Sequence, residues 1–328
     1  MKVCHYSMFN KSGMHRVAES LVAAEKKLGL DSTLINIHEL GQAQIIEQGT
    51  DGDIQVSHTH FPDYMRKNLT KPLKLVWVGH GTPEHVFQTS VEAGQNKGYG
   101  HGDGWMLVQH WLQTADACVT FWPRHQKIWQ SLCDKHTIVD CVPLGVDKTF
   151  WAPAATKGKF AGDPSVFTAE NGHYIKWPLD LFILWPWVYP HVKGNALLHA
   201  CYLPNDQHRW FFPLVNRNGC SYASHISPLV WDHDALKNVH NSIDYFIGLV
   251  RYGDYNRACL EANACGTKTI SYIGNPYSDF WLPEGDQRVM ADELIKILNK
   301  EVEPRKKEIV PDIEETAKGM KAIYERIL

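Results

Sequence analysis

The sequence contains no apolar run long enough to cross a membrane. A spanning helix needs about 20 consecutive apolar residues, and no such stretch occurs among the 328 residues of the chain. Residues 1–7 form a strand-like start and lack the long apolar region of a secretory signal. We therefore expect a cytoplasmic protein without a membrane span.

Paired metal-binding or disulfide motifs are also missing. The eight cysteines are scattered without a C-x-x-C pair, and most of them lie in apolar runs. The histidines lack the paired spacing of a zinc site. Buried free thiols in a reducing compartment are therefore expected, and no metal site is predicted.

Neither sign of charge is in marked excess. Lys and Arg number 33 against 36 Asp and Glu, which gives a net charge of −3. This balance provides no general attraction to nucleic acid or to an acidic membrane, although local basic patches remain open. Hydrophobic residues make up 44% of the chain. That content and the length together fit two domains of about 150 residues, each with its own core.

Strand-like and helix-like segments alternate along both halves of the chain, which predicts parallel sheets with right-handed crossovers. Two such units would place a cleft between the carboxyl ends of their strands. A polar stretch at residues 157–162 suggests the boundary. We therefore expect an α/β protein with two Rossmann-like domains, residues 1–157 and 158–311, and a last helix, residues 312–328. The predicted helices include residues 13–28, 123–132, 179–187, 205–212 and 234–241.

The most informative segment is RYGDYNRACLEANACG, residues 251–266, which an apolar stretch, residues 267–273, follows directly. This pattern predicts a loop, a short helix, a glycine stop and a strand. The helix would begin at the carboxyl end of a sheet, where its N–H groups and dipole favour a phosphate. Glu261, one turn inside, is then placed to accept hydrogen bonds from sugar hydroxyls. Its alternative role is that of a solvated or N-capping acid.

This segment resembles the nucleotide-sugar signature of family-4 GT-B glycosyltransferases, approximately E-G-F-G-x-x-x-x-E-A-x-A-C-G-x-P-V-I. Glu261 corresponds to the second acid, which holds the donor ribose in that family, and residues 262–266 complete the match. Gly253 stands in place of the first acid, with Asp254 one residue late, so the donor sugar is not identified. Residues 140–153, DCVPLGVDKTFWAP, resemble the phrase that closes the family's first domain.

The resemblance implies a GT-B fold and a retaining glycosyltransferase that uses a nucleoside-diphosphate sugar, with a UDP-sugar favoured. In that mechanism the leaving diphosphate is stabilised by N–H groups, Lys and Arg in a cleft that excludes water. No Ser/His/Asp or paired-carboxylate arrangement occurs, and no D-x-D motif lies where a metal would bridge the phosphates. The reaction is therefore expected to need neither a metal nor another cofactor. The last helix is expected to cross back onto the first domain.

The resemblance also assigns residues to the donor site. Gly13, between the first strand and the first helix, would let the backbone approach the diphosphate, or it is simply a helix-entry turn. His80 ends a strand at the position of the family's sugar-facing histidine, with a structural role as the alternative. Lys176 matches the lysine that clamps the diphosphate. Glu170 or Asn171, however, stands where an arginine is expected.

A replacement cation is therefore required, because an acid beside a diphosphate is unfavourable. Arg257, in the first turn of the signature helix, is the first candidate and Arg251 the second, and both could instead be surface charges. The predicted catalytic group comprises His80, Lys176 and Arg257. The predicted donor-binding residues are Gly13, Arg251, Gly253, Asp254, Tyr255, Asn256 and Glu261.

The acceptor is less defined. A Gly- and His-rich insertion, residues 79–104, is expected on the acceptor side, where His85, His101 and Trp105 would contact the acceptor. The forms RYGDYNR and EGDQ resemble phage-encoded transferases that glycosylate hydroxymethylated DNA bases in the host cytoplasm, which would require base extrusion and a basic surface. Candidate residues for that surface are Lys67, Lys71, Lys74, Lys97, Arg124 and Lys127. A sugar-nucleotide epimerase and an inactive nucleotide-sugar-binding protein are further alternatives, and the oligomeric state is open.

Overall fold

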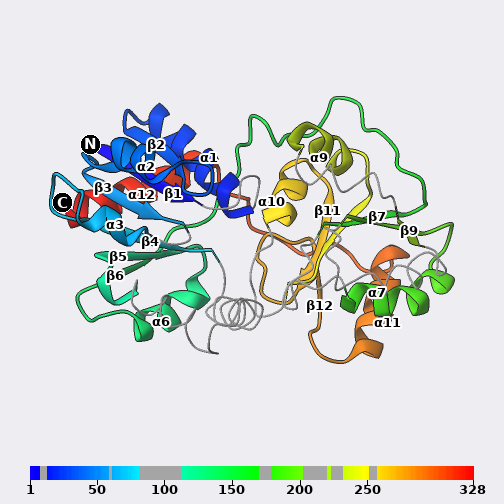
Figure 1. The fold of residues 1–328 in the computed structure, drawn as a ribbon. Helices are drawn as coiled ribbons and strands as arrows, with labels where there is room; N and C mark the ends of the chain where they lie inside the picture. The colour runs from blue at the N-terminus through cyan, green and yellow to red at the C-terminus, as the bar shows by residue number, and fades with distance from the viewer. Residues whose placement is uncertain are drawn as a thin grey trace. The chain divides into compact units, whose positions relative to one another are not determined.

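The computed structural model describes residues 1–7, 13–58, 61–80, 112–169, 179–201, 220–222, 232–250 and 257–328. Contacts divide the chain into two units. Unit 1 contains Met1–Asp147 and Pro311–Leu328, and unit 2 contains Lys148–Val310. Each unit is built on a parallel sheet (Figure 1). Within the described residues, no helix is both long and apolar enough to span a membrane.

The sheet of unit 1 has six parallel strands. They are β1 (Lys2–Ser7), β2 (Asp31–Asn36), β3 (Ile54–Ser57), β4 (Leu75–Gly79), β5 (Ala117–Thr120) and β6 (Ile138–Cys141), in the order β2-β1-β3-β4-β5-β6. The helices are α1 (Gly13–Lys27), α2 (Gln42–Gly49), α3 (Asp63–Arg66), α6 (Pro123–Leu132) and α12 (Ile313–Ile327). Every residue of β3, β4 and β5 is buried, as expected for strands covered on both faces.

Alternate residues of β1 face different layers of unit 1. Cys4 and Tyr6 belong to a core cluster with residues of α2, α3 and α6. His5 points to the opposite face, where its ring contacts Glu25 of α1. A histidine within an otherwise apolar strand therefore reaches the layer formed by α1 and α12.

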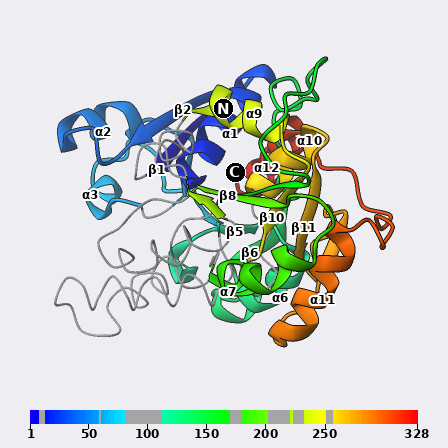
Figure 2. The same cartoon turned by 90° about the vertical axis from the view of Figure 1, so that its right-hand side faces the viewer.

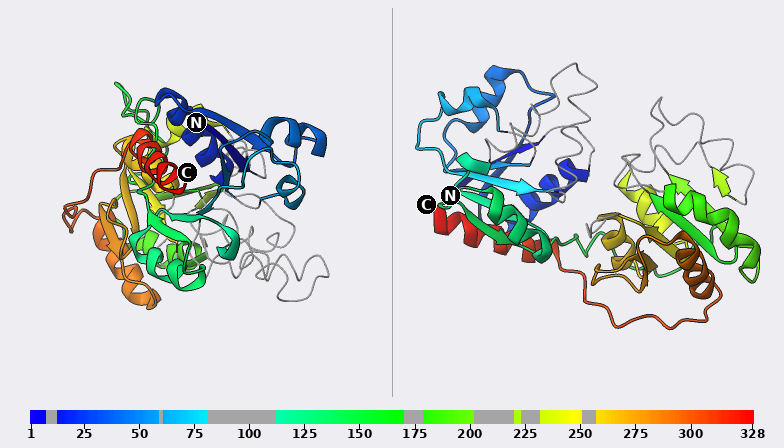
Figure 3. Two further views of the ribbon diagram at one scale, coloured as in Figure 1. Left: turned by 90° about the vertical axis from the view of Figure 1, so that its left-hand side faces the viewer. Right: turned by 90° about the horizontal axis from the view of Figure 1, so that it is seen from below.

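The C-terminal helix α12 returns to unit 1, as the sequence predicts, and packs beside α1 (Figure 3). Val146 forms a parallel bridge with Asp312, and the Gly145 N–H donates to Thr316 Oγ1 at 2.8 Å. A Cβ at Gly145 would overlap the backbone of Asp312. The glycine of the domain-closing phrase thus permits the close approach of the last helix.

Unit 2 also has six parallel strands, in the order β12-β11-β10-β7-β8-β9. They are β7 (Ser165–Ala169), β8 (Leu197–Cys201), β9 (Cys220–Tyr222), β10 (Tyr245–Gly248), β11 (Lys268–Tyr272) and β12 (Phe280–Leu282). The helices are α7 (Leu179–Val188), the short 3-10 turn η1 (Tyr189–His191), α9 (His233–His240), α10 (Arg257–Ala264) and α11 (Gln287–Leu298). Helices α7 and α11 lie on one face of the sheet, and α9 and α10 lie on the other (Figure 2).

The segment after Asp147 belongs to unit 2, whereas the sequence suggests a boundary ten residues later, at residue 157. Trp151 is 2% exposed, and its ring centroid lies 5.8 Å from that of His233 and 5.9 Å from that of His240. The Ala154 N–H donates to Asn241 Oδ1 at 2.6 Å. This packing holds the end of the domain-closing phrase on unit 2.

Five described elements are absent from the sequence-based assignment: α2, α3, η1, β12 and α11. The predicted helix at residues 205–212 lies outside the described residues.

Candidate functional site

The strand order of unit 2 reverses between β7 and β10. Counted from the start of the unit, the strands lie in the order 3-2-1-4-5-6, which is the order of dinucleotide-binding α/β folds. In such sheets ligands bind outside the carboxyl ends of the strands at the point of reversal. β7 and β10 are parallel neighbours, with Phe167 beside Phe246, so both strands end at one edge of the sheet. Helix α10 is the next described element after β10 and leads into β11.

Helix α10 begins at Arg257, as the sequence predicts, and ends in a glycine stop. Gly266 has φ +79°, in the left-handed region. Its N–H donates to the Asn263 carbonyl at 2.9 Å, and the Thr267 N–H donates to the Ala262 carbonyl at 3.0 Å. These two bonds form a Schellman motif, in which glycine avoids the strain that a Cβ would cause. The Ala-Cys-Gly part of the signature therefore ends the helix and turns the chain into β11.

Arg257 and Glu261 form an ion pair along α10. Arg257 Nε lies 2.7 Å from Glu261 Oε1, with the two residues at i and i+4. The side chains are 14% and 4% exposed, respectively. Glu261 is therefore neither solvated nor an N-cap, because it lies buried one turn inside the helix. The predicted acid and the predicted replacement cation stand together at the start of α10.

Buried polar contacts fix α10 against the turn before β12. Asn263 Nδ2 donates to the Tyr277 carbonyl at 2.7 Å and lies 3.3 Å from Thr269 Oγ1. Cys259 Sγ lies 3.5 Å from Ser278 Oγ. The helix that carries the Arg257–Glu261 pair is thus anchored on its inner face.

In unit 1, His80 directly follows β4 and contacts a second histidine. His80 Nε2 lies 2.7 Å from Nδ1 of His58, the residue that follows β3. His58 Nε2 lies 3.0 Å from Nδ1 of His5 in β1. The three residues come from neighbouring strands, since β1 pairs with β3 and β3 pairs with β4. His80 is half-buried, and its ring packs edge-on against Phe121 at a centroid distance of 5.5 Å.

The row of histidines ends at a buried acid. His5 Nε2 lies 2.8 Å from Glu25 Oε2, and the same oxygen accepts from Ser32 Oγ at 2.6 Å. Tyr324 of α12 donates to Glu25 Oε1 at 2.8 Å. Burial alone would raise the pKa of Glu25, but the charge of His5 and the hydrogen bonds from His5, Ser32 and Tyr324 outweigh it and lower that pKa. This arrangement of His5, His58 and Glu25 was not predicted from the sequence.

The environment of His58 favours a neutral ring. Burial, and then the charges of His80, His5 and His15, hold the pKa of His58 well below its ordinary value of 6.5. A signal for this cluster exists in the sequence, since His5 lies in an apolar strand and His58 immediately follows another. Neither position, however, reveals its partner.

Gly13 is the first residue of α1. A Cβ at this position would meet no atom within 4 Å among the described residues, and Gly13 is not among the glycines with positive φ. Neither the backbone nor the packing therefore requires glycine there. Both interpretations of Gly13, as an approach point for diphosphate and as a helix-entry turn, stay open.

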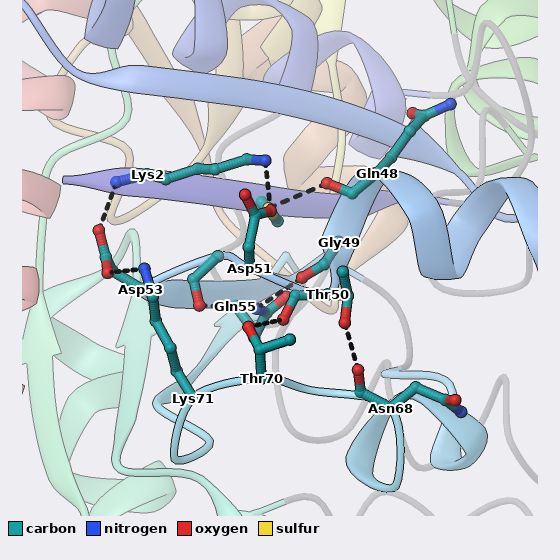
Figure 4. Close-up of polar contacts among 12 residues, drawn as sticks. Lys2, Gln48, Gly49, Thr50, Asp51, Asp53, Gln55, Asn68, Thr70 and Lys71 are labelled. Carbon is teal, nitrogen blue, oxygen red and sulfur yellow. Dashed lines mark hydrogen bonds and ion pairs between the residues drawn. The ribbon is translucent and has the colours of Figure 1, made fainter.

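The lysines proposed for a DNA-binding surface are partly neutralised. Lys71 Nζ lies 2.6 Å from Asp53 Oδ1, and Lys74 Nζ lies 3.6 Å from Asp116 Oδ1. Figure 4 shows Lys71 within a group of polar side chains that also joins Lys2 to Asp51. Lys2 is the first residue of β1 and Lys71 precedes β4, so this group lies at the amino edge of the sheet, opposite the His80 edge.

Nine predicted site residues lie outside the described residues. They are His85, His101, Trp105, Lys176, Arg251, Gly253, Asp254, Tyr255 and Asn256. Their assigned roles remain predictions.

The two sheets define a known fold class, and solved structures of glycosyltransferases share it. Sucrose-phosphate synthase from Thermosynechococcus elongatus matches with a TM-score of 0.68 at 12% identity, over 100% of this chain and 97% of that one. Trehalose 6-phosphate synthase from Burkholderia multivorans matches with a TM-score of 0.66 at 9% identity, over 99% and 98%. HepE from Anabaena, solved with UDP and glucose, matches with a TM-score of 0.61 at 13% identity, over 100% and 97%.

These similarities confirm the predicted GT-B fold. At identities this low they establish the architecture and not the substrates. No protein-family model matches the chain, and no similar protein was found among curated sequences.

Proposed function

We propose that the protein is a glycosyltransferase that moves a sugar from a nucleoside-diphosphate sugar to an acceptor hydroxyl with retention of configuration. The observation that carries this proposal is the buried Glu261 carboxylate, one turn inside a helix that follows the switch point between β7 and β10. The GT-B fold supports the reaction class. A UDP-sugar is the favoured donor, because HepE was solved with UDP-glucose and the pneumococcal transferase GtfA with UDP and GlcNAc.

Glu261 can bind the donor ribose while it keeps its pair with Arg257. A carboxylate offers about four lone-pair positions, and the contact with Arg257 Nε engages Oε1. Hydroxyls of a ribose diol can therefore donate to the same group. Because the carboxylate is buried, a donor analogue without these hydroxyls would leave it poorly solvated, which makes the contact selective.

Arg257 connects this acid to the diphosphate. A guanidinium carries five N–H donors, and Nε–H is the one directed at Glu261. At the start of α10, the guanidinium and the helix dipole both favour the negative charge that develops on the leaving diphosphate. We assign Lys176 as a second cation, Gly13 and the start of α1 to the diphosphate, and His80 to a hydroxyl of the transferred sugar. With these groups the reaction needs no metal.

The test is incubation of the protein with a panel of UDP-, GDP- and ADP-sugars without an acceptor. A transferase slowly hydrolyses its donor and releases the sugar with its anomeric configuration retained, which NMR reports, and EDTA leaves the rate unchanged. An epimerase would yield a different nucleotide sugar, and a binding protein would give thermal stabilisation alone. Either of these two outcomes contradicts the proposal.

Substitution of Glu261 tests the site itself. Glu261→Ala should raise the donor KM by at least about 10-fold, because a hydrogen bond to a buried charged group contributes about 1.5–3 kcal/mol. The matched control is Glu301→Ala, since Glu301 is an exposed acid of the same unit that pairs with Lys193 at 3.0 Å. The control should keep the wild-type KM. Equal effects of the two substitutions would refute the assignment. Lys176→Ala should mainly lower kcat.

The acceptor is a separate question. A hydroxymethylated DNA duplex would require cations on the acceptor side, and Lys71 and Lys74 already pair with carboxylates. We therefore favour a saccharide or small-molecule hydroxyl. A salt-sensitive mobility shift with hydroxymethylated duplex, together with sugar transfer to it, would instead establish the DNA acceptor.

A further inference from the structure

A buried row of hydrogen-bonding side chains leads from His80 into the interior of unit 1. The three contacts, His80–His58, His58–His5 and His5–Glu25, measure 2.7, 3.0 and 2.8 Å. His5 and Glu25 are 0% exposed and His58 is 2% exposed. The described contacts thus connect a residue at the carboxyl edge of the sheet to an acid of α1 that also contacts β2 and α12.

The acid sets the direction of every hydrogen bond in this row. The lowered pKa of Glu25 keeps its carboxylate ionised, so it only accepts. His5 must then donate through Nε2–H. A protonated His5 contributes its charge to the lowered pKa of Glu25; before His5 takes up that proton, its neutral ring presents Nδ1 as an acceptor. His58 in turn donates through Nε2–H to His5 and presents Nδ1. His80 therefore donates through Nε2–H to His58, and its Nδ1 carries the lone pair.

We propose that Glu25, His5 and His58 form a proton relay behind His80. They hold His80 in the Nε2–H tautomer, and they draw the positive charge of a proton taken up at His80 Nδ1 back to His5, beside Glu25. The relay deepens the proposed function and rests on it, because it assumes that His80 faces the donor sugar.

The proton transfer conserves atoms and charge. A hydronium ion of the solvent gives a proton to His80 Nδ1 and becomes water, and the Nε2 proton of His80 moves to His58 Nδ1. The Nε2 proton of His58 then moves to His5 Nδ1, while His5 keeps its Nε2–H toward Glu25. One proton has been taken up, His58 and His80 are neutral again, and the imidazolium is His5. Return of the protons in reverse order restores the starting state.

Electrostatics favour this final position of the charge. An isolated buried imidazolium is costly, whereas one paired with a carboxylate is compensated. Among the described residues, the titratable groups that face the row include Glu25 and His15 of α1 and Tyr324 of α12, and the carboxylate is at the His5 end. A cation held at His80 would also oppose the positive charge that develops on a glycosyl ring in the transition state. The relay moves that charge away.

The tautomers can be observed without any activity, by nitrogen-15 NMR of the full-length protein labelled at histidine. His5, His58 and His80 should all be protonated at Nε2 above neutral pH, and His58 should stay neutral on acidification. Above neutral pH, a neutral ring of His5 or His58 that is protonated at Nδ1 instead of Nε2 overturns the relay. Because this readout needs no donor, it decides the relay separately from the proposed function.

Removal of the Glu25 charge tests whether this acid acts on His80 through the row of histidines. Glu25→Gln should lower by at least about one unit the pH at which the row takes up its proton, observed as the change of His80 from the Nε2–H to the Nδ1–H tautomer. The matched control is Glu314→Gln, since Glu314 is an exposed acid of the same unit that lies 3.4 Å from Lys27. The control should leave that titration unchanged. An unchanged His80 titration in Glu25→Gln, or an equal shift in both variants, overturns the relay.

His58→Gln separates orientation from proton transfer and covers the case in which Glu25→Gln does not fold. A glutamine amide can accept from His80 and donate to His5, but it cannot pass a proton along. In the active protein, kcat should fall at least 10-fold while the donor KM changes less than twofold, and His80 should keep its Nε2–H tautomer. A wild-type kcat across the pH range overturns the relay.

Discussion

The hydrogen bond between Tyr324 and Glu25 links the C-terminal helix to the charged core of unit 1, and its removal has a calculable cost. Tyr324 is fully buried, and its hydroxyl donates to Glu25 Oε1 at 2.8 Å. Tyr324→Phe keeps the ring and removes one donor to an ionised acceptor. Hydrogen bonds to charged groups contribute about 1.5–3 kcal/mol. We therefore expect the free energy of unfolding of unit 1 to fall by that amount at pH 7.

The pH dependence of this loss follows from the direction of the Glu25 shift. The pKa of Glu25 is lowered in the folded protein from its ordinary value of 4.5. Its stabilising contribution is therefore fully present above pH 4.5 and is lost as the pH falls through the folded-state value. The difference in unfolding free energy between Tyr324→Phe and the wild type should shrink over the same range.

Urea denaturation at a series of pH values measures both quantities. Tyr6→Phe is the matched control, because the buried Tyr6 hydroxyl donates to a neutral acceptor, Gln55 Oε1, at 2.6 Å. Its loss should be about 0.5–1.5 kcal/mol and should not depend on acid. The reasoning is refuted if Tyr324→Phe costs no more than Tyr6→Phe, or if its cost is the same at pH 7 and pH 3.

Two further predictions concern residues of unit 2, and Gly13 of unit 1 serves as the control in the second. His240 is fully buried, which lowers its pKa to about 3, and neither ring nitrogen has a hydrogen-bond partner among the described residues. The histidine of the unfolded chain binds a proton near pH 6.5, so the wild type loses stability as the pH falls below that value. His240→Phe should therefore unfold at an equal or higher temperature than the wild type at pH 5. A lower unfolding temperature for the variant contradicts this account. Gly266 has φ +79°, so Gly266→Ala should lower the free energy of unfolding, measured by urea denaturation, by about 1–2 kcal/mol. Gly13→Ala should change it by no more than about 0.5 kcal/mol. Similar losses for both variants would show that the helix end does not require glycine at position 266.

The alternation of elements made the GT-B fold predictable, because each buried parallel strand is a short apolar run between helical segments. Helix α11 was missed although its signals are local. Asp286 caps it by accepting from the N–H groups of Arg288 and Val289, and Met290 and Leu294 follow at helical spacing on the buried face. The EGDQ segment, interpreted as a phage-like form, supplies this cap. β12 has only three residues, too few for a periodicity to show.

The two parts of the candidate site differ in how far apart their residues lie in the sequence. Glu261 and Arg257 lie on one helix, so their i, i+4 spacing already placed them on the same face, and the structure adds that the pair is buried. His5, His58 and His80 are far apart in sequence and meet only because β1, β3 and β4 are neighbours. Tyr324 joins them from the far end of the chain. No local pattern encodes such a row.

The central claim is that Glu261 binds the ribose of the donor, and a double-mutant cycle tests it most directly. Calorimetric titration would measure the affinity of wild type and Glu261→Ala for UDP and for 2′,3′-dideoxy-UDP. Loss of the hydroxyls should weaken binding to the wild type at least about 10-fold and have little effect on the variant, so that the two changes are not additive. Independent, additive losses, or a wild type that does not distinguish the two nucleotides, would contradict the account.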